Sequence, residues 1–123
     1  MILAAAVRLF MFLGDAVMFV APTAGELTSS ELALVDHPRS VEGGLRVRAG
    51  VAFGNLLAQD GDYFGPPVNL AARLVASAEP GQVLADHGVT GQLGPDFLVE
   101  PLEPRELRGI DQPVMPYVVR AAT

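Results

Sequence analysis

The sequence predicts an α+β fold in which helices cover an antiparallel sheet. Residues 45–53 alternate apolar side chains with small or charged ones, which is the pattern of a strand with one face in a core. From Val68 onward, apolar residues recur at spacings of three and four, as in a helix packed on one side. Gly14-Asp15 and Gly54-Asn55 lie between strand-like segments and are expected to close hairpins, so the strands that they join should run antiparallel.

The first part of the chain is expected to contain a hairpin, a helix and a long strand. A strand over 9–13 should turn at Gly14-Asp15 into a second strand over 16–21, with the Asp15 carboxylate at the hairpin tip. Pro22 ends this strand, and the segment after it is predicted to be a helix. The strand over 45–53 follows, and residues 56–58 should return antiparallel to it.

The helix that starts at Val68 has two different faces. Four residues are expected to form its buried stripe: Val68, Ala71, Ala72 and Val75. Asn69 and Arg73 are four residues apart and therefore share another face. An amide and a guanidinium one turn apart can hold a sugar oxygen and a phosphate together, although Asn and Arg are also common on solvated helix faces. A strand at 82–85, a short helix near 89–93 and strands at 97–102 and 114–119 are expected to complete the fold.

Composition excludes several classes of protein. The 123 residues, half of them apolar, suffice for one domain with its own core. A net charge of −6 without a cluster of Lys and Arg argues against a nucleic-acid partner. The apolar residues 1–13 are interrupted by Arg8 and are fewer than the roughly 20 that a spanning helix needs, so no membrane segment is predicted. The chain has no cysteine, and the cytoplasm is the default location.

The two histidines do not predict a metal site. His37 and His87 each follow an aspartate, but neither has a second histidine at ligand spacing. Glycine loops with phosphate-cradling spacing and Ser/His/Asp arrangements are also missing from the sequence. The face that carries Asn69 and Arg73 is therefore the main candidate for chemistry.

One segment gives the chain a family resemblance: Asp62-Tyr63-Phe64-Gly65-Pro66-Pro67-Val68-Asn69-Leu70-Ala71-Ala72-Arg73. It resembles the signature segment of class III adenylate/guanylate (nucleotidyl) cyclase homology domains. The similarity extends to 13–18, 46–54, 78–84 and 106–117, in the order of the family, and covers nearly the whole chain. The resemblance implies one partial cyclase homology domain over residues 1–123, with a ferredoxin-like fold.

The resemblance also implies a reaction and a set of site residues. In this family two domains pair head to tail, and two aspartates of one domain hold two Mg²⁺ or Mn²⁺ ions that act on ATP or GTP. ATP is converted to cyclic AMP and pyrophosphate, a reaction of cyclic nucleotide signalling. Asp15 matches the second metal aspartate, Asn69 the residue that orients the ribose, and Arg73 the residue that stabilises charge on the phosphate. Asp62 matches a purine-reading position, and Arg108 a basic residue near the phosphates.

Two departures from the family pattern imply that the chain is inactive alone. The family's first metal aspartate lies on an earlier strand followed by two helices, whereas only 14 residues precede Asp15. Met11 stands where adenylate cyclases of this class carry a purine-reading Lys. Three functions stay open: a homodimeric cyclase, a half-site partner in a heterodimeric cyclase, and a non-catalytic regulatory or relic module. Loss of a strand and two helices would also expose apolar surface and a sheet edge, so an isolated monomer is expected to aggregate or swap elements.

Overall fold

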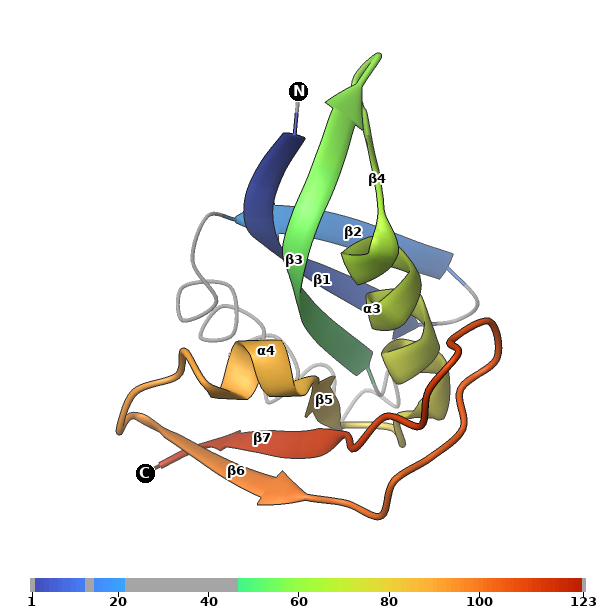
Figure 1. Cartoon of the computed structure of the whole chain (residues 1–123). Coiled ribbons are helices and arrows are strands. Elements are labelled where there is room, and N and C mark those ends of the chain that lie inside the picture. Colours follow the sequence, from blue (N-terminus) through green and yellow to red (C-terminus); the bar gives the residue numbers. More distant parts are fainter. Residues whose placement is uncertain (1, 13–14, 22–46, 123) are drawn as a thin grey trace.

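The computed structural model describes residues 2–12, 15–21 and 47–122, and for the first two segments it describes the backbone alone. Seven strands and two helices occur in these residues: β1 (Ile2–Phe12), β2 (Asp15–Ala21), β3 (Arg48–Gln59), β4 (Asp62–Phe64), α3 (Pro66–Ser77), β5 (Val83–Ala85), α4 (His87–Thr90), β6 (Phe97–Pro101) and β7 (Tyr117–Ala121). The strands form one sheet in the order β2-β1-β3-β5-β7-β6, and β4 pairs with β3 (Figure 1).

The sheet is mixed. β3 and β5 pair in parallel, while every other strand pair of the described residues is antiparallel. The parallel pair arises because α3 carries the chain back along the sheet before β5 begins, as in a βαβ unit. The α+β class predicted from the sequence is confirmed, with one parallel pair in a sheet that was expected to be antiparallel throughout.

β1 and β2 pair antiparallel, as the predicted hairpin requires, but Asp15 is the first residue of β2 and lies opposite Phe12 instead of in the turn. β1 is longer than expected and starts at Ile2 instead of residue 9. β1 is longer because it also pairs with β3. This pairing runs from Ile2, which lies opposite Leu57, to Met11. β1 therefore lies inside the sheet with a strand on each side. The helix predicted after Pro22 lies outside the described residues.

The hairpin predicted at Gly54-Asn55 is wrong. β3 continues through both residues to Gln59, and the chain turns at Asp60 and Gly61, which have φ angles of 53° and 78°. A two-residue hairpin loop of type I′ needs positive φ at both central residues, which Asp-Gly adopts readily. Gly54 has another role: a Cβ there would lie 2.8 Å from Cγ of Pro67, so this glycine makes room for the start of α3.

The first half of β3 and all of β5 are buried on both faces, whereas the sequence had predicted a core on one face of the 45–53 strand. One core cluster contains Val47, Ala49, Val51, Val83, Ala85, Val89 and Val119, and includes α4. On the opposite face, Ala52 and Leu56 pack with Ala71 of α3, and Leu84 and Val118 pack with Leu74 and Ala78. On the face of this strand that was not expected to lie in the core, several residues are small because α3 approaches β3 closely there. A Cβ at Gly50 would lie 2.6 Å from the Ala71 carbonyl oxygen.

Helix α3 buries a stripe that is shifted from the predicted one. Its buried residues are Pro67, Ala71, Leu74 and Val75. Ala71 and Val75 were predicted correctly, whereas Val68 and Ala72 are only half-buried and Leu74 is fully buried. The stripe includes Leu74 because α3 also packs against residues of the 102–116 loop, including Leu102, Leu107 and Val114.

The C-terminal elements are close to their predicted positions. α4 starts at His87, two residues before the predicted helix, because Asp86 caps it: its Oδ1 accepts a hydrogen bond of 3.1 Å from the Val89 amide. β6 and β7 pair antiparallel, as expected for neighbouring strands. Val114 lies outside β7 and forms an isolated bridge with Arg105. Neither described helix is long and apolar enough to cross a membrane.

Candidate functional site

The start of α3 is fixed by backbone geometry. Gly65 precedes the helix with φ 138°, and a Cβ there would lie 3.0 Å from the Asn55 carbonyl oxygen. A side chain at this position would therefore meet both strain and a clash. Pro66 and Pro67 follow at the first helical positions, where their missing amide hydrogens cost nothing. The Gly65 carbonyl accepts the Val68 amide at 3.1 Å, and the position of every later residue of the helix follows from this turn.

Asn69 and Arg73 are both exposed on α3, one turn apart. The opposite side of the helix is held against the sheet by Ala71 and Val75, which are fully buried. The two polar side chains therefore stand on a helix whose orientation is set by packing. An amide can donate to and accept from a sugar hydroxyl, and a guanidinium can hold a phosphate through two parallel N–H donors. The structure confirms that these residues share one face, as their spacing predicted.

Asp62 lies on the same segment, at the start of β4 and three residues before Gly65. Its side chain is exposed, and Oδ1 accepts the Tyr63 amide at 2.8 Å. This local hydrogen bond orients the carboxylate with respect to the backbone of β4. β4 pairs with the end of β3, and the chain then enters α3 directly (Figure 1).

Arg108 is exposed on the 102–116 loop, which Figure 1 shows beside α3. Leu107 and Val114 of this loop pack on the cluster that contains Leu74, so the loop rests on the helix that carries Asn69 and Arg73. Gly109 has φ 80° and turns the chain directly after Arg108. A cavity of about 480 Å³ opens at the end of the loop. Its lining residues are Glu106, Leu107, Arg108, Ile110, Asp111, Gln112 and Pro113.

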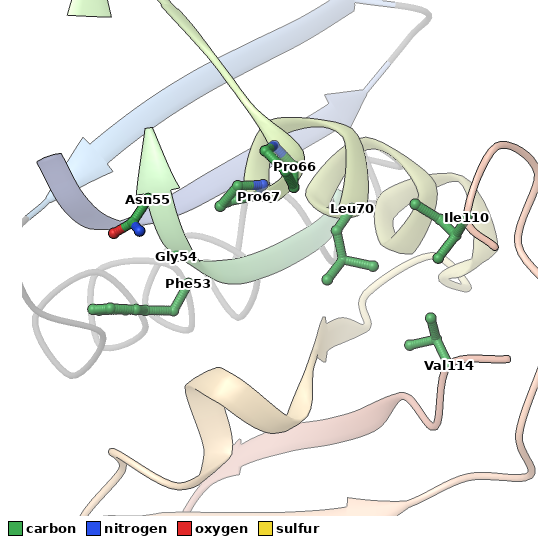
Figure 2. Close-up of a pocket in the computed structure, with 8 residues that line it drawn as sticks. All are labelled: Phe53, Gly54, Asn55, Pro66, Pro67, Leu70, Ile110 and Val114. Atoms are coloured by element: carbon green, nitrogen blue, oxygen red, sulfur yellow. The ribbon is translucent and has the colours of Figure 1, made fainter. Parts of the chain in front are cut away.

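A second cavity, of about 410 Å³, was not foreseen from the sequence. Figure 2 shows its lining residues, which come from β3, the first turns of α3 and the loop: Phe53, Gly54, Asn55, Pro66, Pro67, Leu70, Ile110 and Val114. Leu70 and Val114 point into the same space, and Asn55 supplies the one polar side chain of the lining. The sequence gives no local signal for it, because its walls are joined by tertiary packing alone.

Sequence reasoning also overlooked Arg105. Its Nη1 donates to Ser77 Oγ at 2.6 Å and to the Ser77 carbonyl oxygen at 3.3 Å. Ser77 is the last residue of α3, so this contact ties the 102–116 loop to the helix of the candidate site. The partners are 28 residues apart, and no spacing rule connects them.

The metal position predicted at Asp15 is the first residue of β2, for which the backbone alone is described. Met11 lies on the neighbouring strand, opposite Ala16 of β2 and Arg48 of β3. Among the side chains that the structure describes, no group of three or more His, Asp or Glu could hold a metal ion.

Asp86, which caps α4 on the other face of the sheet, has a raised pKa. Burial raises the pKa of this carboxyl group above its ordinary value, and the backbone hydrogen bonds from the cap of α4 oppose that rise. The His87 ring lies near Tyr117, with ring centroids 6.4 Å apart. Asp86 and His87 lie at the start of α4 and Tyr117 lies on β7, so these residues are not on the face of α3 that carries Asn69 and Arg73.

Comparison with known proteins gives relatives over most of the chain. An uncharacterized protein of Mycobacterium tuberculosis is 50% identical over 110 residues, which are 89% of this chain and 29% of that protein. A pH-sensitive adenylate cyclase of the same species is 39% identical over 113 residues, 88% of this chain and 28% of that enzyme. The chain thus spans less than a third of the length of these curated relatives. No protein-family model matches the chain.

The fold has close counterparts among solved structures. The crystal structure of an adenylate/guanylate cyclase/hydrolase from Silicibacter pomeroyi superposes with a TM-score of 0.82 at 18% identity, covering 100% of this chain and 99% of that one. At this identity the likeness establishes the fold. It agrees with the sequence relatives, which include adenylate cyclases.

Proposed function

Because the chain belongs to the class III adenylate/guanylate cyclase homology domains, we propose that it supplies the Asn69 and Arg73 half of a composite cyclase site. A second cyclase domain would complete the site with its two metal aspartates. The observation that carries this proposal is the exposed row of Asn69 and Arg73, on a helix whose other side is fully packed. The reaction would be the conversion of ATP to cyclic AMP and pyrophosphate.

In this site Asn69 would hold the ribose of the nucleotide, and Arg73 the α-phosphate. Cyclisation requires the 3′-hydroxyl oxygen to attack the α-phosphorus while the bond to pyrophosphate breaks. Orientation of the ribose by Asn69 would keep that oxygen in line, an effect that in general accelerates reactions strongly. Arg73 would offer its N–H donors to the phosphate oxygens that gain charge in the transition state. Both roles need side chains that are exposed to a partner surface, as these are.

Metal binding belongs to the partner domain in this proposal. A two-metal phosphoryl transfer uses Mg²⁺ or Mn²⁺ held by carboxylates, and such ions neutralise charge on the reacting oxygens. Among the side chains that the structure describes, no cluster of three His, Asp or Glu could hold a metal ion. In this proposal the chain acts by binding and orienting the nucleotide.

Asp62 and Arg108 would bind the base and the polyphosphate. Asp62 is exposed at the start of β4, and Arg108 is exposed on the loop that packs on α3. Met11 offers no donor to a ring nitrogen, so base selection at this half-site should be weak and GTP should compete with ATP.

The test is a mixing experiment. The chain is combined with a complete cyclase domain whose own Asn and Arg have been replaced by alanine, so that the domain retains its metal aspartates and is inactive alone. Cyclic nucleotide production from ATP and from GTP is then measured with Mn²⁺. We expect activity only in the mixture. Arg73→Ala in this chain should lower the rate by about 100-fold or more, the scale found when a transition-state donor is removed.

Arg120→Ala is the matched control. Arg120 is also exposed but lies on β7, where it pairs with Glu100, and its loss should leave the mixed activity within about twofold. A silent mixture of two folded proteins that associate would contradict the proposal and leave a non-catalytic module. Activity of this chain alone would instead establish a homodimeric cyclase.

A further inference from the structure

The contact between Arg105 and Ser77 joins two parts of the proposed half-site. Arg105 is half-buried, and its Nη1 donates to Ser77 Oγ at 2.6 Å and to the Ser77 carbonyl oxygen at 3.3 Å. The last carbonyl groups of a helix have no partner within it and favour a nearby positive charge. α3 has no basic residue in its own last turn. Arg105 thus supplies from the loop the cation that caps this helix.

Arg105 also stands at the base of the 102–116 loop. Its backbone exchanges two hydrogen bonds of 2.8 Å with Val114, and the Leu102 amide donates to the Pro116 carbonyl at 2.9 Å. The two arms of the loop therefore run side by side, and residues 106–113 form its tip. Arg108 lies in this tip, three residues beyond Arg105. A guanidinium anchored at the base limits where the tip can be.

Ser77 lies on the same helix row as the proposed ligand-binding residues. Asn69, Arg73 and Ser77 follow one another at intervals of four, so they stand one above the other along α3. The anchor of the loop is consequently one turn below Arg73 on the face that would meet the nucleotide. The Arg105 side chain therefore links the position of Arg108 in the loop to the positions of Asn69 and Arg73 on α3.

We propose that Arg105 is a positioning residue of the half-site: its contact with Ser77 holds the Arg108 tip at a fixed place beside the Asn69 and Arg73 row. The inference rests on the proposed function for its catalytic consequence. The apolar contacts of Leu107 and Val114 with the cluster around Leu74 keep the loop on the helix, but they are not directional. The guanidinium makes two hydrogen bonds to one residue, which fixes orientation as well as distance.

A double-mutant cycle separates positioning from general destabilisation. In the mixed-site assay we expect Arg105→Met to lower kcat about tenfold in the wild-type background, with a smaller change in KM. In an Arg108→Ala background the same substitution should change kcat by less than about twofold, because the tip no longer carries the group to be placed. Equal losses in both backgrounds would overturn the proposal. Arg105→Lys keeps a charged nitrogen donor but on a shorter, more flexible side chain without the rigid guanidinium plane, and it should recover only part of the rate.

Hydrogen exchange tests the same contact without any activity. In Arg105→Met we expect amides of the loop tip, including Ile110, which donates to the Leu107 carbonyl at 3.0 Å, to exchange about tenfold faster. The α3 amides that precede its last turn should be unaffected. Ser77→Ala removes one acceptor and should give a smaller change in the same amides, and Arg120→Met is the control.

The two failures can be told apart. If the wild-type mixture makes no cyclic nucleotide, the proposed function is wrong, and the exchange experiment alone judges the anchor. If the mixture is active but loop-tip exchange is the same in Arg105→Met and wild type, the anchor is wrong and the proposed function is unaffected.

Discussion

Replacement of Gly50 by alanine should destabilise the fold through the contact between β3 and α3. The new Cβ would lie 2.6 Å from the Ala71 carbonyl oxygen, 2.8 Å from the Val75 amide nitrogen and 3.0 Å from Leu74 Cβ. Two of these atoms belong to the helix backbone, so no side-chain rotation relieves the clash. An ordinary contact begins near 3.4 Å, which requires α3 to move away by about 0.8 Å.

The magnitude follows from overpacking. Extra methyl groups in a packed core typically cost about 1–3 kcal/mol, and the shift of α3 would also loosen the contacts of Ala71, Leu74 and Val75, which are fully buried. Alanine lowers the conformational entropy of the unfolded chain relative to glycine, and this effect stabilises the folded state by roughly 0.5 kcal/mol. The difference is a net loss of about 0.5–2.5 kcal/mol in the free energy of unfolding, and we expect a value of about 2 kcal/mol because two of the clashing atoms are backbone atoms.

Urea unfolding measures this loss. With an m-value of about 1–3 kcal/mol per molar urea, the midpoint of Gly50→Ala should fall by about 1 M. Gly94→Ala is the matched control, because a Cβ added at Gly94 would meet no atom within 4 Å and the residue has no positive φ. If Gly50→Ala unfolds at the same urea concentration as Gly94→Ala, the close approach of α3 to β3 is refuted.

Three further predictions concern other parts of the chain. Burial raises the pKa of Asp86 above 3.8. The free energy of unfolding of wild type, relative to that of Asp86→Asn, should therefore fall as pH rises from about 4 through the raised pKa. Urea unfolding at each pH measures this difference. Glu100→Gln should change the unfolding free energy by less than about 0.5 kcal/mol, because both partners of the Arg120 pair are more than 60% exposed. Met11→Lys should raise the preference of the mixed site for ATP over GTP about tenfold, measured as a ratio of kcat/KM.

The sequence predicted residues whose roles depend on local spacing. Asn69 and Arg73 were placed on one helix face by a four-residue interval, and the structure has both exposed there. Strand alternation predicted which residues of β3 share a face, but it did not distinguish a solvent-facing position from one covered by a helix. Gly50 and Ala52 were taken as the outer face for that reason, and they are buried under α3.

Glycine was the least predictable residue from sequence, because one residue type serves two physical needs. Gly54-Asn55 was expected to turn the chain, but Gly54 sits within β3 and makes room for Pro67. The turn falls instead at Asp60-Gly61, where both residues have positive φ. A turn depends on the dihedral angles of its own residues, so neighbouring residues in the sequence can predict it. A close approach depends on an element that is distant in the sequence, so neighbouring residues cannot predict it. Arg105 escaped prediction for the same reason, since its partner Ser77 is 28 residues away.

Stability and the proposed site are coupled through α3. Gly50 and Ala71 let the helix lie close to β3, and the same packing sets how far Asn69 and Arg73 stand from the sheet. A shift of about 0.8 Å in α3 would displace both side chains together, and displacements of this size cost catalysis heavily when groups must be in line. Gly50→Ala should therefore lower the mixed-site kcat even under conditions in which the variant is fully folded. Gly94→Ala should not, because its added methyl group meets no neighbour.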